Sequence, residues 1–299
     1  MSLTSHRFID PRALAAISRL SLLAKTVVDG FMLGVQRSKH VGAGLEFNQY
    51  RSYEPGDDLR RVDWKLYARS DRYYVRESEI ETSIAVRFVL DATASMAHEE
   101  EGFSKFDYAR FLVASLAYLA YEQGDAIGLQ VIGEGAVPDL PARHFSQHLH
   151  RLLYELEELE PVGVWPARNQ LAHVLSGESR RSVIVFVTDM HEVDDEILQT
   201  LETIRALKHE VILFHLLGAQ EMAFSYRGQV TFEDLETGRR LACDADSARS
   251  AYLEVQSRAL DTLNRTLRDR DIAYERITMD QPLDVAPRQY LKRRSRLNV

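Results

Sequence analysis

From about residue 83 onward, short apolar runs alternate with longer segments that suit helices. Near-continuous apolar stretches of strand length occupy residues 83–90, 126–133, 181–190, 211–217 and 273–279. Helices are expected between them, at residues 104–124, 146–160, 194–210 and 244–271. Apolar strands that alternate with helices are typical of an open, mostly parallel sheet covered on both faces. The pattern therefore predicts a doubly wound α/β fold, with a mostly parallel sheet and helices on both faces.

The first 80 residues follow a different pattern. Pro11 opens a segment with apolar residues near one helical face, which predicts a helix at 11–32. A turn at Pro55–Gly56, a short helix after it and a strand at 72–78 are expected further along. We therefore expect an N-terminal helix with a small β region over residues 1–80, and the α/β domain over residues 81–299.

Composition narrows the class of protein. The chain has 299 residues, 45% hydrophobic and 27% charged, which is typical of a globular protein with a substantial core. The net charge of −8 gives no support to nucleic-acid binding. Cys243 is the single cysteine, so no internal disulfide forms, which fits a reducing compartment. The apolar run at 111–121 is shorter than the roughly 20 residues that span a bilayer, so we expect a cytoplasmic protein without a membrane span. His215, inside an apolar strand, is expected to be a hydrogen-bonded core residue.

Oxygen-bearing side chains lie at the carboxyl ends of two of the predicted strands. Asp91, Thr93 and Ser95 follow the first apolar strand at positions i, i+2 and i+4, and Asp189 follows the apolar run of a later one. Open α/β sheets form their sites at the carboxyl ends of strands, near a switch in strand order. Mg²⁺ prefers oxygen ligands in octahedral geometry. With few protein anions around it, such a metal keeps an open position for a partner's carboxylate, which indicates a binding site.

These short patterns resemble a known family. D-x-T-x-S at 91–95, with V-T-D at 187–189 on a later strand, resembles the metal-ion-dependent adhesion site of von Willebrand factor A domains. Residues 44–96 resemble the signature of the domain-of-unknown-function-58 family over about fifty positions. That family joins a characteristic N-terminal region to a von Willebrand A-like domain. The resemblance implies a von Willebrand A-like fold for most of the chain.

The resemblance also implies a ligand set for Mg²⁺ or another divalent cation. Carried over position by position, the metal ligands are Asp91, Thr93, Ser95 and Asp189. These domains usually offer a threonine from a middle loop, and the counterpart in this sequence is Asn169. An amide oxygen can bind Mg²⁺, but the substitution departs from the family pattern.

The implied function is that of a bacterial cytoplasmic interaction protein. Relatives are associated with MoxR-type AAA+ ATPases, and such pairs are thought to act in the assembly or maturation of other proteins. This sequence contains no P-loop G-x-x-x-x-G-K-[ST], so any ATPase activity must come from the partner.

The charged segment at 55–69 allows two interpretations. In the first, its aspartates pair with its arginines and Trp64 packs beneath them, which holds the N-terminal region on the α/β domain. In the second, the segment docks a partner through Arg60, Asp63, Trp64 and Arg69.

Two alternatives to a metal-dependent interaction module stay open. Asp91 also suits the nucleophile of a haloacid-dehalogenase-like phosphohydrolase, with Thr188 and Lys208 as phosphate ligands. Against this enzyme, Thr93 stands where a second acid is usual, and no late paired-aspartate motif follows. The other alternative is a scaffold with a degenerate metal site, which the Asn169 substitution favours.

Overall fold

A computed structural model of the protein describes residues 19–39, 50–52, 67, 73–76, 84–134, 139–166, 182–191, 195–284, 286–288 and 290–291. The chain divides into two compact units, one of Met1–Phe31 with Ile84–Val299 and the other of Met32–Ser83. In the smaller unit, strand β1 (Tyr50–Ser52) pairs antiparallel with β2 (Tyr74–Arg76), which confirms the strand expected at 72–78.

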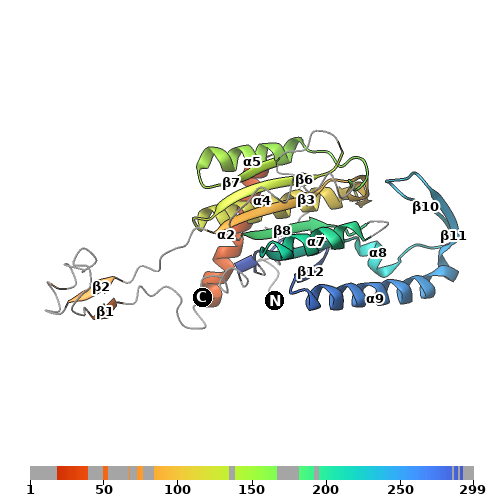
Figure 1. Ribbon diagram of the computed structural model, residues 1–299. Helices are drawn as coiled ribbons and strands as arrows, with labels where there is room; N and C mark the ends of the chain where they lie inside the picture. The colour runs from red at the N-terminus through yellow and green to blue at the C-terminus, as the bar shows by residue number, and fades with distance from the viewer. Residues whose placement is uncertain are drawn as a thin grey trace. The chain divides into compact units, whose positions relative to one another are not determined.

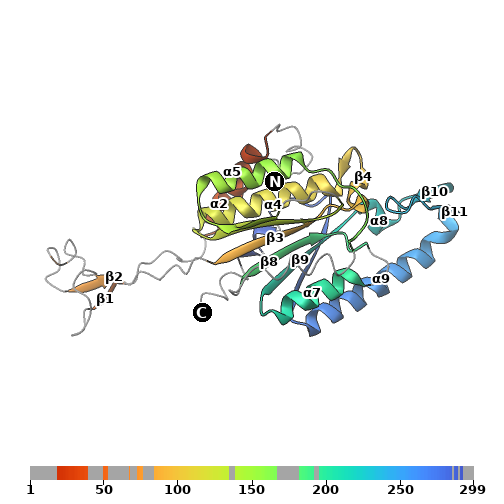
Figure 2. The same cartoon turned by 45° about the horizontal axis from the view of Figure 1, so that its top comes forward.

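A six-stranded sheet forms the centre of the larger unit (Figures 1 and 2). Its order is β12-β9-β8-β3-β6-β7, and all neighbours run parallel except β7, which pairs antiparallel with β6. From β3 the chain moves outward through β6 to β7 and then returns to the other side of β3, so strand order reverses between β3 and β8. The strands span Ala85–Asp91 (β3), Ala126–Ile132 (β6), Asp139–Arg143 (β7), Val183–Thr188 (β8), Glu210–Leu217 (β9) and Ala273–Thr278 (β12).

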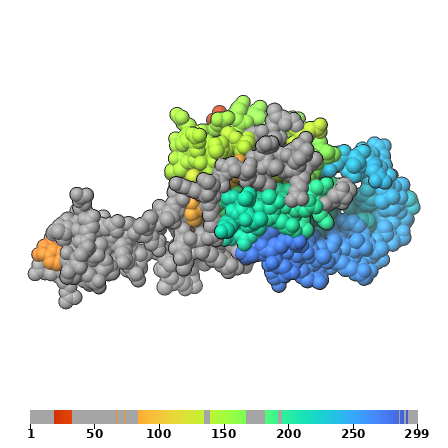
Figure 3. All heavy atoms as spheres, viewed as in Figure 1, coloured from red at the N-terminus to blue at the C-terminus, as the bar shows by residue number. Residues whose placement is uncertain are grey.

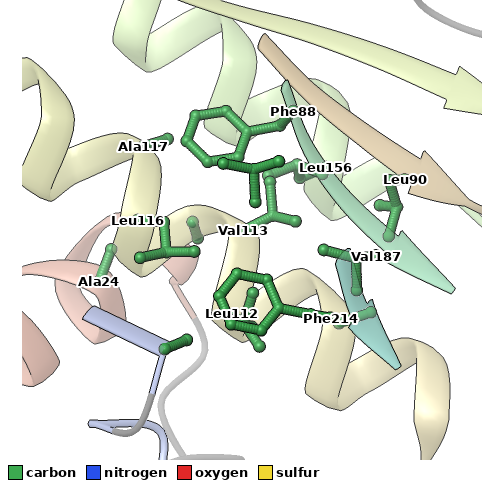
Figure 4. Close-up of a cluster of buried hydrophobic side chains, with 14 of the residues drawn as sticks. Ala24, Phe88, Leu90, Leu112, Val113, Leu116, Ala117, Leu156, Val187 and Phe214 are labelled. Carbon is green, nitrogen blue, oxygen red and sulfur yellow. The ribbon is translucent and has the colours of Figure 1, made fainter. Parts of the chain in front are cut away.

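Helices cover both faces of this sheet, because successive strand residues point to opposite sides. Phe88 and Leu90 of β3 belong to a core with α2, α4 and α5, whereas Val89 belongs to a second core with α7 and α9. Figure 4 shows part of the first core. The helices span Leu20–Lys39 (α2), Lys105–Glu122 (α4), Ser146–Glu158 (α5), Glu196–Ala206 (α7) and Ala245–Asp269 (α9). The doubly wound fold class predicted from the sequence is confirmed.

Helix α4 lies at the centre of the first core. Its N-cap Ser104 accepts a hydrogen bond from the Asp107 backbone N–H at 3.0 Å, and the Asp107 carboxylate accepts from the Ser104 N–H. This capping box satisfies two backbone donors at the start of the helix. Since α4 packs against the sheet and two other helices, it is apolar almost all round, as its sequence indicated.

The N-terminal helix packs in the core of the larger unit. The sequence predicted a helix at 11–32, of which residues 11–18 lie outside the described residues, and helix α2 runs from Leu20 to Lys39. Leu23, Ala24 and Val27 are fully buried in the core of the larger unit. Up to Phe31, the helix therefore contributes to the core of the α/β unit rather than to a body of its own.

Several short elements were not predicted. They are the edge strand β7, the five-residue helix α8 (Ala219–Ala223), and β11 (Arg240–Asp244), which forms a hairpin with β10 (Gln229–Glu233). The two strands that were not predicted, β7 and β11, are mostly exposed, so their sequences lack the apolar runs that marked the central strands. Helix α9 runs along the outer surface beside α7 (Figure 3), with an ion pair of 2.6 Å between Arg270 and Glu202. In the described ranges, no helix is both long and apolar enough to cross a membrane.

Neighbouring leucines on α2 test its place in the core. Leu23 is 0% exposed and Leu22 is 56% exposed. We expect Leu23→Ala to lower the free energy of unfolding of the full chain by about 2–5 kcal/mol through lost burial and a residual cavity. The same change at Leu22 should stay within about 0.5 kcal/mol. Urea denaturation followed by circular dichroism measures both, and equal effects would contradict the packing of α2 in this core.

Candidate functional site

The carboxyl ends of β3 and β8 form the meeting point that the sequence predicted. Asp91 is the last residue of β3, and Asp189 follows the last residue of β8. The Ser95 hydroxyl donates to Asp189 Oδ1 at 3.2 Å, and the Ser95 and Thr93 hydroxyl oxygens lie 3.0 Å apart. The structure therefore brings together four of the five predicted metal ligands.

Asp91 is completely buried and hydrogen-bonded through both oxygens. Oδ1 accepts from the Thr93 backbone N–H at 2.9 Å, and Oδ2 accepts from the Thr188 hydroxyl at 2.6 Å. Burial and repulsion from Asp189 raise the pKa of Asp91 well above its usual range, although these hydrogen bonds oppose the shift. A nearby cation would relieve this repulsion.

Asp189 has a cationic partner that the sequence analysis missed. Lys105 Nζ donates to Asp189 Oδ2 at 3.1 Å and to Glu221 Oε1 of α8 at 3.0 Å. Burial disfavours charged Lys105, but attraction to the two carboxylates outweighs it and raises the pKa of Lys105. Burial also opposes the charge on Asp189, yet attraction to Lys105 outweighs it and lowers the pKa of Asp189.

A signal for Lys105 was present in the sequence. The residue follows the Ser104 cap as the first residue of α4, where the helix dipole disfavours positive charge. A lysine at such a position needs acidic neighbours from elsewhere in the fold. The sequence does not show which carboxylates they are, because Asp189 and Glu221 lie 84 and 116 positions away.

His215 of β9 holds the backbone of Asp189. Its Nε2 donates to the Asp189 carbonyl oxygen at 3.0 Å, so in the neutral ring Nδ1 accepts from the Tyr274 hydroxyl at 2.8 Å. Burial lowers the pKa of His215 to about 4, which keeps the ring neutral near pH 7. The expectation of a hydrogen-bonded core histidine is confirmed, and the residue also positions the site.

Glu236 is a second residue that the sequence did not connect with the site. It lies in the turn between β10 and β11, and the Thr93 and Ser95 side chains lie near enough to its carboxyl group to lower its pKa. Burial raises the pKa of Glu236, and these side chains partly offset the rise. The Oε1 atom is buried and, among the described residues, finds no hydrogen-bond partner.

The start of the middle loop runs beside the D-x-T-x-S turn. The Val162 N–H donates to the Ala92 carbonyl at 2.8 Å, and the Ala94 N–H donates to the Gly163 carbonyl at 2.9 Å. Gly163 has a φ of +79°, and a Cβ there would collide with the Glu134 side chain, so the turn requires glycine. The remaining predicted site residues lie outside the described residues: Asn169, Arg60, Asp63, Trp64 and Arg69.

The donor set suits a hard cation. Neighbouring ligands of octahedral Mg²⁺ lie about 3 Å apart, because Mg–O bonds measure about 2.0–2.1 Å. The Thr93–Ser95 and Ser95–Asp189 oxygen pairs, at 3.0 and 3.2 Å, match this spacing. Within the part of the chain that is described, no three His, Cys, Asp or Glu side chains gather as a metal group. A cation here would therefore depend on the hydroxyl oxygens, and the buried Oε1 atom of Glu236 is a further donor nearby.

The geometry does not suit a phosphohydrolase. Asp91, the required nucleophile, is 0% exposed, and each of its oxygens already accepts a hydrogen bond. Lys208 precedes β9 and so lies at the opposite edge of the parallel sheet from Asp91. Of the two phosphate ligands considered for this enzyme, only Thr188 is near Asp91.

The chain is similar to one protein family and to uncharacterized mycobacterial proteins. A family model described as "Protein of unknown function DUF58" matches residues 49–261. The uncharacterized protein Rv1480 of Mycobacterium tuberculosis is 29% identical over 237 residues, covering 77% of this chain and 73% of that protein. The uncharacterized protein Mb1516 of Mycobacterium bovis gives the same values.

Two solved structures are similar at low identity. The conserved hypothetical protein BatB from Bacteroides thetaiotaomicron is 13% identical, with 72% of this chain and 100% of that chain covered and a TM-score of 0.46. An aerotolerance-related membrane protein from Bacteroides fragilis is 15% identical, with 70% and 98% covered and a TM-score of 0.47. The fold assignment rests on the sheet topology described above, not on these likenesses.

The ion pairs of Lys105 with Asp189 and Glu221 should contribute strongly to the free energy of unfolding. Lys105→Met leaves the Asp189 and Glu221 carboxylates without their buried cation, so we expect a loss of about 3–5 kcal/mol in the free energy of unfolding. Lys25→Met on the exposed side of α2 is the matched control and should change stability by less than about 0.5 kcal/mol. Denaturant unfolding at pH 7 measures both, and a Lys105→Met protein as stable as the control would refute the pairing.

His215 should give the protein a specific pH dependence. Its pKa is about 4 when folded, against 6.5 when exposed, so between these values the unfolded chain binds a proton that the folded chain excludes. Stability should therefore fall as pH drops from about 6.5 to 4, by up to about 3 kcal/mol from this residue. His215→Gln keeps a donor for the Asp189 carbonyl and should flatten the pH dependence. His150→Gln on exposed α5 should not, and identical unfolding profiles for all three proteins would contradict this assignment.

Proposed function

This chain belongs to the DUF58 family, and from that premise we propose that it is a non-enzymatic protein-interaction module with a divalent cation in its recognition site. The cation, Mg²⁺ or a similar ion, would be held at the ends of β3 and β8 by Asp91, Thr93, Ser95 and Asp189. Asn169 of the middle loop is the fifth proposed ligand. The von Willebrand A-like topology, with the site at the switch in strand order, supports this proposal.

The observation that carries the proposal is the contact between two loops that are 94 residues apart in sequence. The Ser95 hydroxyl lies 3.2 Å from Asp189 Oδ1 and 3.0 Å from the Thr93 hydroxyl, so three oxygens from two strand ends face one small region. Oxygen donors at this spacing suit a hard divalent ion.

The charge of the donor set favours binding over catalysis. Two of the four donors near the site are neutral hydroxyls, and Asp189 already shares its charge with Lys105. A divalent cation here would retain positive charge and an open coordination position. An acidic side chain of a partner protein can fill that position, which makes recognition depend on the metal.

We further propose that the partner is a MoxR-type AAA+ ATPase and that the pair serves protein assembly or maturation in the bacterial cytoplasm. The family resemblance supports this choice. In such a pair the ATPase supplies the energy, and this chain supplies a metal-dependent contact to the ATPase or its client.

Removal of one hydroxyl should weaken the metal site selectively. We expect the wild-type chain to bind Mg²⁺ in isothermal titration calorimetry and Ser95→Ala to weaken binding at least about tenfold. Ser115→Ala is the matched control, because Ser115 is buried within α4 and bonds only to the Phe111 carbonyl among the described contacts. The metal assignment fails if wild type binds no divalent ion or if both variants bind it equally.

The same variants test the partner. With a purified MoxR-type ATPase from the same organism, we expect Ser95→Ala to weaken association in Mg²⁺, whereas Ser115→Ala should behave as wild type. The variants are more decisive than a chelator, because a chelator also removes Mg²⁺ from the ATPase. Equal association of all three chains would rule out metal-dependent contact with this partner.

A further inference from the structure

The β10–β11 hairpin reaches the candidate site from a distant part of the chain. In Figure 2 it lies with α8 and the short strand β4 (Glu99–Glu100) at the same end of the sheet. Phe224, which is 3% exposed, packs against Tyr252 of α9 with ring centroids 4.5 Å apart and against Phe232 of β10 at 5.9 Å. This aromatic cluster holds strand β10 of the hairpin against α9.

The tip of the hairpin has a defined conformation. The Asp234 carboxylate accepts from the Glu236 N–H at 2.9 Å, the Thr237 N–H at 3.2 Å and the Thr237 hydroxyl at 2.6 Å. Asp234 Oδ1 also lies 3.8 Å from the ring Nε2 of His191. The backbone N–H of His191 donates to Asp189 Oδ1. The turn is thus ordered by its own hydrogen bonds and lies beside the loop that follows β8.

This turn directs Glu236 at the hydroxyl pair of the site. Its Oε1 atom is buried without a partner in the described ranges, and Thr93 and Ser95 lie near enough to its carboxyl group to lower its pKa. Asp189 is close enough to repel it. Burial is the main factor that disfavours a charged Glu236 here, with a smaller contribution from Asp189, while Thr93, His191 and Ser95 favour the charge. A cation at the site would favour it further.

We propose that Glu236 is an internal carboxylate ligand of the cation at this site. The inference rests on the proposed function, since it requires that a divalent ion binds beside Thr93 and Ser95. Glu236 then occupies the coordination position that a partner's acidic side chain would take. The hairpin is therefore a built-in competitor of the partner, and partner binding requires the hairpin tip to move away from the site.

Chemical rescue tests this role directly. Mg²⁺ is titrated by calorimetry into the full-length wild type, Glu236→Ala and Glu233→Ala, each in chloride and in acetate at equal ionic strength. Glu233 is the matched control, because it lies on the same hairpin but pairs with Arg240 at the exposed surface. We expect Glu236→Ala to lose at least about tenfold in Mg²⁺ affinity and acetate to restore most of it. Acetate should leave the wild type and Glu233→Ala unchanged, because their coordination position is filled.

The outcomes separate this inference from the function on which it rests. If the wild type binds Mg²⁺ and Glu236→Ala binds it equally well, with no effect of acetate, Glu236 is not a ligand although the metal site stands. If Glu236→Ala binds Mg²⁺ more tightly than the wild type, Glu236 obstructs the ion and the ligand assignment is wrong. If no chain binds Mg²⁺ in either salt, the metal site and the inference both fail.

Discussion

Two buried carboxylates at the ends of neighbouring strands constrain the rest of this site. Asp91 and Asp189 repel each other in a region from which water is largely excluded, and burying two unpaired charges would cost several kcal/mol. A lysine from the start of α4, the Thr188 hydroxyl and backbone N–H groups donate hydrogen bonds to these carboxylates and stabilise their charge. These groups come from three parts of the chain, the turn after β3, the start of α4 and the end of β8, so the site and the packing around it depend on each other.

Charged residues from other parts of the fold surround the strand-end residues of the site. Lys105 joins Asp189 to Glu221 of α8, and the hairpin after α8 carries Glu236 to the hydroxyls of Thr93 and Ser95. The segment from α8 to α9 therefore contributes two carboxylates, Glu221 and Glu236, to the surroundings of the site. A change in that segment would alter what the strand-end residues can bind without changing them.

The same arrangement explains why the site suits recognition better than catalysis. Asp91 serves to organise its own loop, because both of its oxygens accept hydrogen bonds from neighbouring groups and none faces solvent. The donors that remain available are hydroxyls and shared carboxylates, which in the proposed function would hold a cation without supplying a nucleophile. In that proposal, carboxylates compete for one open coordination position.

Local patterns of apolar runs and strand-end polar residues were enough to predict the central sheet, its helices and the two strand ends that meet. The sequence placed Asp91, Thr93, Ser95 and Asp189 together, because parallel strands put their carboxyl ends at one edge. That α2 joins the main core and that Lys105 and Glu236 reach the site is evident only in the folded chain. The Lys105 contacts join residues 84 and 116 positions apart, and the place of Glu236 depends on the path of an exposed hairpin, so no local periodicity encodes either.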